Sequence, residues 1–229
     1  MQNNDLHLTN CFRMEVNHLT IDELVFEKAL RRKLSDETVK IMEIKYYCLS
    51  EKGMNFLSDL YEIHIRYRTV SSNNDEEKKE TNSEQAINVV VKIEPLNELL
   101  HSIVSQQDLF HTETKVLRDV LPRIKKYVSH QLGPDLLYGC CDDPRILVME
   151  NLIERGFAMK DRQKGLPLEH CRLVLQQLAR LHAGSVAVFE KVRAWKNHTF
   201  LFLFTKYKVK SYICLLNLPA IKIDPSIIR

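Results

Sequence analysis

The sequence predicts an α+β fold, in which a mostly antiparallel sheet of five strands packs against helices. Short runs rich in Val, Ile and Tyr, some with apolar residues at alternate positions, are typical of strands. Longer segments with apolar residues three and four positions apart are typical of amphipathic helices. We expect strands at Thr38–Ser50, Leu60–Val70, Asn88–Pro95, Gly133–Tyr138 and Ile146–Met149.

The composition fits a globular protein with nearly balanced charge. The chain has 229 residues, of which 45% are hydrophobic, enough to bury a sizeable core. Its 33 basic and 30 acidic residues leave a net charge of +3, too small to indicate a nucleic-acid or membrane partner. The start of the chain lacks a basic segment followed by an apolar run, so we expect no signal or transit peptide and a cytoplasmic protein. The six scattered cysteines lack zinc-ligand spacing and are interpreted as reduced thiols.

A helix is expected first, followed by a hairpin. The helix covers Ile21–Leu34, with Thr20 or Asp22 as its cap. The hairpin joins the first two strands, and apolar residues alternate with polar ones along the second. The predicted buried residues are Leu24, Val25, Ala29, Leu30 and Leu34 in the helix, and Tyr61, Ile63, Ile65 and Tyr67 in the strand.

Two connections in this region are polar. The hairpin connection reads EKGMNFLS and contains Gly53, Asn55 and Ser58, a composition typical of a tight loop. Such a loop is either a plain hairpin turn or a lid whose backbone N–H groups face a phosphate. The segment Ser71–Gln85 is almost free of apolar residues, so we expect a loop there.

The third strand, NVVVKIEP, carries Lys92 within an apolar run and is predicted to be central to the sheet. A buried lysine needs a partner, which is an acid from a nearby helix, a bound phosphate, or both. The helix predicted over Leu109–Val120 offers Glu113, turned inward beside apolar neighbours. The alternative is an exposed glutamate on the surface of that helix.

The second half is predicted to become helical. A short helix is expected at Leu96–Val104, a connector at Glu150–Ile153 after the last hairpin, and a loop at Glu154–Pro167. A long amphipathic helix follows from Leu168 to about Trp195, with His182 interpreted as a structural histidine beside its stripe. The stripe predicted to be buried holds Cys171, Leu175, Leu178, Leu181, Ser185, Val188 and Val192.

The order of these elements and the strings GMNFLSDLYEIHIRY, VVVKIEP, FHTETKVL, ILVMENLIERGF and LVLQQLARLHAGSV resemble the ecdysteroid kinase-like (CHK kinase-like) family of arthropods, relatives of choline and aminoglycoside kinases. The resemblance covers roughly Ile21–Lys191. It implies a kinase-like N-terminal lobe over residues 1–150. Residues 151–196 would then hold a hinge and the first helices of an incomplete C-terminal lobe, and residues 197–229 a divergent tail.

The resemblance implies an ATP-dependent transfer of the γ-phosphate to a hydroxyl of a small-molecule acceptor, ecdysteroids being the proposed substrates of some members. It assigns the loop with Gly53, Asn55 and Ser58 to cover the phosphates, Lys92 to hold the α- and β-phosphates, and Glu113 to hold Lys92. The adenine hinge would be Met149, Glu150, Asn151 and Leu152. The family more often has aspartate where this chain has Asn151.

The catalytic half of the family pattern does not occur in this sequence. Phosphoryl transfer needs carboxylates that orient the hydroxyl and bind Mg²⁺. The family supplies them in a His-Gly-Asp loop and an Asp-Phe motif, and neither string is present. His182 is followed by Ala183. We therefore expect no catalytic residue, no metal ligand and little or no phosphotransfer.

The sequence allows two explanations for the absence of the catalytic motifs, and two alternative functions. The chain is either a truncated gene model or splice form, or a short protein that has given up catalysis. The alternative functions are a nucleotide-binding or regulatory pseudokinase that pairs with a full-length relative through its long helix, and a purely structural interaction domain.

Overall fold

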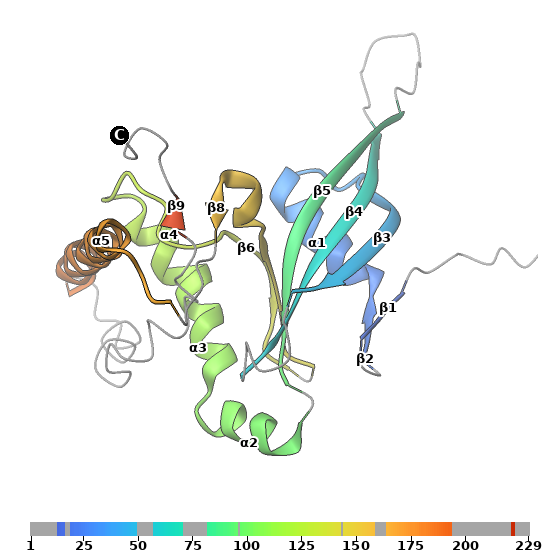
Figure 1. The fold of residues 1–229 in the computed structure, drawn as a ribbon. Coiled ribbons are helices and arrows are strands. Elements are labelled where there is room, and N and C mark those ends of the chain that lie inside the picture. Colours follow the sequence, from blue (N-terminus) through green and yellow to red (C-terminus); the bar gives the residue numbers. More distant parts are fainter. Residues whose placement is uncertain are drawn as a thin grey trace, which may run out of the picture.

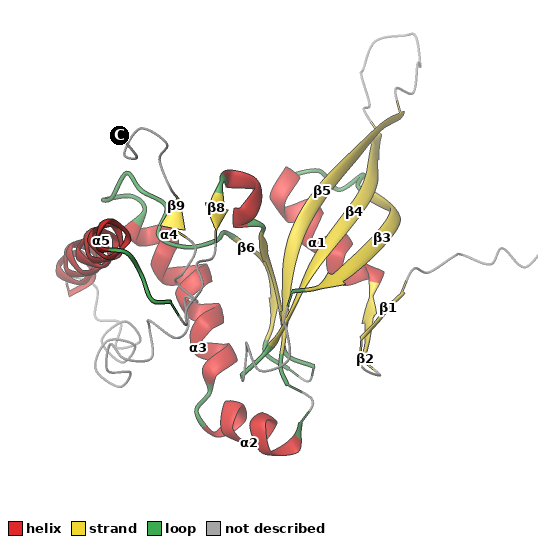
Figure 2. Cartoon of the chain, viewed as in Figure 1, coloured by secondary structure: helices red, strands yellow, loops and turns green. Residues whose placement is uncertain are grey.

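A five-stranded antiparallel sheet with helices on both faces forms the centre of the molecule (Figures 1 and 2). The computed structural model describes residues 13–16, 19–49, 57–70, 82–95, 97–142, 144–158, 164–193 and 221–222. The strand order β3-β4-β5-β7-β6 confirms the predicted α+β class and number of strands. The strands are β3 (Lys40–Cys48), β4 (Asp59–Val70), β5 (Asn82–Ile93), β6 (Leu136–Cys140) and β7 (Ile146–Glu150).

The central strand is β5, as the sequence predicts for the run that carries Lys92. It pairs with β4 along its whole length and with β7 from Val89 to Ile93. The prediction of a loop up to Gln85 is wrong at its end, because β5 begins at Asn82, paired with Val70. Sheet hydrogen bonds join backbone groups, so a polar segment opposite a long strand extends the ladder without apolar side chains.

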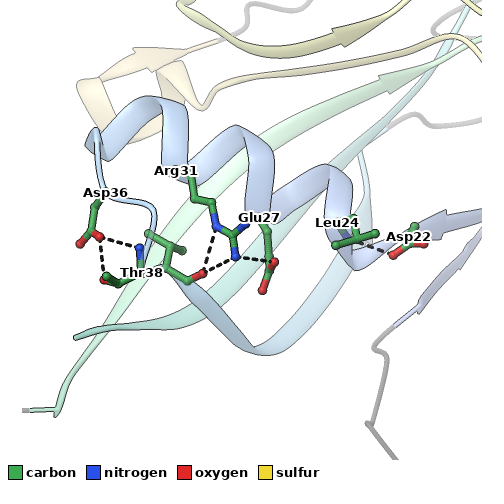
Figure 3. A network of polar contacts seen from close by, with 7 residues as sticks. Asp22, Leu24, Glu27, Arg31, Asp36 and Thr38 are labelled. Carbon is green, nitrogen blue, oxygen red and sulfur yellow. Dashed lines mark hydrogen bonds and ion pairs between the residues drawn. The ribbon is translucent and has the colours of Figure 1, made fainter.

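One face of the sheet is covered by α1 (Glu23–Leu34), which follows the two-stranded ribbon of β1 (Arg13–Val16) and β2 (Leu19–Asp22). Asp22 caps the helix by accepting a hydrogen bond from the Leu24 N–H at 3.0 Å (Figure 3). At the other end, Arg31 pairs with Glu27 at 2.9 Å and donates to the Val39 carbonyl oxygen. The helix is thereby tied to the chain entering β3.

The buried face of α1 differs from the predicted stripe. Phe26, Ala29 and Leu30 are buried, whereas Leu24 is 53% exposed and Leu34 is also exposed. The sheet selects the side of the helix that carries the large Phe26 ring, which lies one position past Val25. Against this face lie the predicted residues of β4, so the alternation of Tyr61, Ile63, Ile65 and Tyr67 is confirmed.

The opposite face of the sheet is covered by α3 (Leu109–Lys115), the π-helical turn η1 (Val116–Val120) and α4 (Leu121–Ile124). A single helix over Leu109–Val120 was expected. Pro122 has no N–H for the carbonyl four residues earlier, and the widened turn before it accommodates the ring. This second core contains Leu147 and Met149 of the sheet together with Phe110, Val116, Leu117, Val120, Leu121 and Ile124.

The remaining elements include the longest helix, α5 (Leu168–Arg193), which lies against α4 at the outer edge of the molecule (Figure 1). Leu181, Ser185 and Val188 are buried as predicted, but Leu175 is 62% exposed and His182 is exposed. None of the described helices is long and apolar enough to cross a membrane. The other elements are α2 (Glu98–Gln106), the 3-10 turn η2 (Leu152–Arg155), and β8 (Phe157–Ala158) paired with β9 (Ile221–Lys222).

Candidate functional site

A buried ion pair joins the central strand to the helix on its second face. The Nζ atom of Lys92 lies 2.6 Å from the Oε2 atom of Glu113. The two side chains are only 11% and 8% exposed. The lysine ammonium also lies 5.7 Å from the centre of the Phe110 ring. The structure therefore brings together the two residues whose pairing the sequence predicts.

Each partner is positioned by a separate element. Lys92 and Val90 point to the α3 side of β5, because residues two apart in a strand share a face, while Val89 and Val91 point to α1. Asp108, with φ of 53°, makes the sharp turn between α2 and α3. The turn lets α3 lay Glu113, Phe110 and Thr114 against the sheet, where all three are buried.

Both side chains of the ion pair lie in a site with little exposure to solvent. Burial raises the pKa of Glu113 above its usual value, and the positive charge of Lys92 opposes that rise. Removing one partner of such a pair leaves a buried charge without compensation, at a typical cost of about 3–5 kcal/mol. The ammonium group is therefore held in place by Glu113, with 11% of the Lys92 side chain exposed.

The loop predicted to cover a phosphate is described only at its end. Gly53 and Asn55 lie outside the described residues. Ser58 is buried and immediately precedes β4, in which Leu60 is the direct neighbour of Lys92 across the strands. The described end of the connection therefore approaches the same part of β5 as the ion pair.

The predicted hinge follows the pair along β7. Met149 is buried and pairs with Val90, two residues before Lys92. Glu150 accepts hydrogen bonds from Gln131 at 2.7 Å, from the Asp135 N–H at 3.2 Å and from Arg155 at 3.0 Å. Burial acts to raise the pKa of Glu150, but these donors outweigh it and lower that pKa.

Asn151 is the most buried residue of the hinge, and both ends of its amide are used. Its Nδ2 atom donates to Glu62 at 2.7 Å, and its Oδ1 atom accepts from the Ile153 N–H at 3.0 Å, which caps η2. An aspartate at this position has no N–H to donate and would place a second carboxylate beside Glu62. The contact with Glu62 therefore gives a physical reason for asparagine here. Leu152 begins η2 and is half-buried.

Sequence reasoning missed a second buried acid, Glu94, two residues after Lys92. Its carboxylate lies 2.6 Å from the Arg145 guanidinium and 3.1 Å from His101, and it accepts the Arg145 N–H. Arg145 also donates to Ser105 at 2.8 Å. This network ties β5 to α2 and to the turn between β6 and β7. The sequence did contain a sign of this site, because Glu94 is a second charged residue in the apolar run that carries Lys92.

Two other features bear on ligands. Within the part of the chain that the structure describes, no group of three or more His, Cys, Asp or Glu side chains is arranged to hold a metal ion. A cavity of about 140 Å³ lies beside α4, between Leu117 and Asp135, and its lining includes none of the predicted cofactor-binding residues. Its lining is apolar for the most part and does not include Lys92 or Glu113.

No curated protein matches the chain. The sequence profile of the ecdysteroid kinase-like family matches residues 52–213, which include the connection before β4, the ion pair, the hinge and α5. The match ends within the segment 197–229 that was expected to diverge from the family. The antiparallel sheet and its paired helix are the N-terminal lobe of a kinase-like fold, and the chain belongs to the ecdysteroid kinase-like family.

Proposed function

We propose that this chain binds an ATP-type nucleotide beside Lys92 and that the 229-residue chain transfers little or no phosphate. The observation that carries the proposal is the buried Lys92–Glu113 ion pair, 2.6 Å long, on the strand next to the hinge. A lysine fixed by an acid from a helix is the arrangement by which kinase-like folds hold nucleotide phosphates. Membership of the family supports the same reading of the pair.

In this proposal each residue has a defined task. Lys92 donates to oxygens of the α- and β-phosphates, and Glu113 keeps its ammonium group aimed at them. The task of covering the phosphates is assigned to Gly53, Asn55 and Ser58, as the family resemblance implies. The hinge offers backbone groups of Met149–Leu152 to the edge of the adenine, held in place by Asn151. Mg²⁺, when bound with the nucleotide, neutralises phosphate charge.

Phosphoryl transfer is the activity of the parent family, with a hydroxyl of a small molecule as acceptor. The sequence of this chain lacks both family motifs that supply the catalytic and metal-binding carboxylates. Electrostatic stabilisation and positioning provide most of the catalysis of this reaction, so their loss leaves binding without efficient turnover. A regulatory nucleotide-binding module is the second candidate, which the exposed side of α5 favours because it leaves a surface for another chain.

The test is thermal unfolding of the 229-residue protein with and without Mg²⁺-ATP. A ligand at a hundred times its dissociation constant stabilises the folded state by about 2.7 kcal/mol, so we expect a clear rise in Tm. Lys92→Met should abolish the rise. Lys45, on the exposed surface of β3, provides the matched control, and Lys45→Met should keep it.

A double variant separates binding from folding. Lys92→Met alone leaves Glu113 buried without a cation and is expected to lower stability. In Lys92→Met/Glu113→Leu both charges are replaced by apolar groups, which should restore much of the lost stability but not the ATP response. An unchanged Tm rise in this double variant would refute the proposed site, as would the absence of any rise in the wild type.

A further inference from the structure

The outward side of α5 carries an apolar stripe with one charge at each end. The stripe consists of Arg172, Leu175, Ala179, Ala183, Val186 and Glu190, all exposed. Leu175 and Val186, the two large apolar side chains of the stripe, are 62% and 55% exposed. Leu181, Gly184 and Val188 face the other way, toward α4. Figure 1 shows α5 at the edge of the molecule, and the stripe lies on the side of the helix opposite the residues that pack on α4.

The two charged residues lie on the same side of the helix. Arg172 and Glu190 are separated by 190 − 172 = 18 positions, which is five turns at about 3.6 residues per turn. Among the described residues, Arg172 has one ionic partner, Glu169, at 2.7 Å across one turn, and both side chains are about 60% exposed. Glu190 has no ionic partner among the described residues. The stripe therefore has a positive end and a negative end.

This pattern is complementary to itself when one copy is reversed. We propose that the chain forms a two-fold symmetric dimer in which the α5 helices pack antiparallel along this stripe. In that register Arg172 lies opposite the partner's Glu190, and Ala179 lies opposite the partner's Ala183. Leu175 then packs beside the partner's Val186. Every contact occurs twice, as a two-fold interface requires.

The charges and the small side chains of the stripe favour an antiparallel second copy of the chain as the partner that packs on it. A parallel pair would place Arg172 against the partner's Arg172 and Glu190 against the partner's Glu190, which is repulsive. The small alanine side chains at the centre allow two helix axes to approach to about 8–10 Å. The stripe is about 27 Å long at 1.5 Å per residue, long enough for the two ion pairs and the apolar centre to form together. This inference does not depend on nucleotide binding.

The test is a charge exchange read by sedimentation equilibrium of the full chain. The wild type should be dimeric at micromolar concentration. Arg172→Glu and Glu190→Arg each place like charges opposite one another twice, and each should weaken the dimer roughly tenfold or more. An equimolar mixture of these two variants restores both ion pairs, so the mixture should form a heterodimer although each variant alone does not.

A second variant tests the apolar centre. Leu175→Glu should give a monomer whose circular dichroism and Tm match those of the wild type at concentrations where the wild type is also monomeric, because the side chain is exposed in one copy. Leu99→Glu is the matched control, because Leu99 of α2 is also exposed, at 70%, and this variant should stay dimeric. A monomeric wild type would overturn the proposal and leave the stripe to another protein. A dimer that is indifferent to the charge exchange would place the interface elsewhere.

Discussion

Glu150 joins the start of the predicted hinge to the loop before β6 and to the end of η2. Three donors from three positions converge on its carboxylate, and its side chain is 14% exposed. Two of them, Gln131 and the Asp135 N–H, come from the loop before β6, and Arg155 comes from the end of η2. The ionised form of Glu150 therefore holds the start of the hinge against its neighbours.

This arrangement predicts a specific loss of stability in acid. The pKa of Glu150 in the fold lies below its usual value of 4.5, so ionised Glu150 stabilises the fold above pH 4.5. That contribution is lost as the pH falls through the lowered pKa. The free energy of unfolding in urea, measured from pH 7 to pH 3, should decrease less for Glu150→Gln than for the wild type. Identical acid dependence in the two proteins would contradict this role.

At the scale of residues, the sequence was sufficient to predict the pairing of Lys92 with Glu113, because each is a charged residue within an apolar pattern. A lone ammonium in an apolar strand demands an acid, and the inward face of the next long helix offered Glu113. The Asn151–Glu62 contact joins residues 89 positions apart and could not be found in this way. Nothing in the local pattern of either residue specifies the other, because their meeting depends on the order of β4, β5 and β7.

At the scale of elements, the packing of α5 against α4 depends on one glycine. A Cβ atom at Gly184 would lie 2.4 Å from Cγ2 of Ile124 and 2.9 Å from Cγ2 of Val128. Both distances are far below van der Waals contact, so the two helices are close only because Gly184 has no side chain. The sequence indicated close packing at Ala183, Gly184 and Ser185, and the structure confirms it for the last two, which are buried.

Gly184→Val should therefore separate the two helices. Inserting a side chain into a packed interface typically costs about 1–3 kcal/mol, and we expect a loss of stability in that range by urea unfolding. Gln176→Val, at an exposed position two turns earlier, introduces the same side chain into the same helix and serves as control. Equal stability of the two variants would mean that α5 does not pack on α4 as described.

Periodicity predicted where the elements lie better than which sides they bury. The stripes expected for α1 and α5 contain Leu24 and Leu175, and both are exposed. Each helix has a second side that can pack on the rest of the protein, and this is the side that is buried. It carries Phe26 in α1, and Gly184 with its neighbours in α5. The choice between two apolar sides is made by the shape of the surface they pack on, which a single sequence does not display.

At the scale of the whole molecule, the residues proposed to bind nucleotide are separate from the family motifs proposed to react. The ion pair, the hinge and the contacts that support them lie between β4 and η2 in the chain, a span that includes α2 and α3. The family motifs that carry the catalytic carboxylates would follow α5, and this sequence does not contain them. Nucleotide binding and phosphoryl transfer should therefore behave as independent properties of this chain.

The last prediction follows from that separation. With Mg²⁺-ATP and a panel of small alcohols, including a steroid alcohol, the purified chain should release no ADP above the rate without protein, although its Tm rises with ATP. In the proposed site Lys92 holds phosphates and Glu113 holds Lys92, so neither side chain is left to orient an attacking hydroxyl. The measurement is coupled ADP release by the wild type beside Lys92→Met/Glu113→Leu. Turnover that requires Lys92 would show that another carboxylate of this chain performs the missing step.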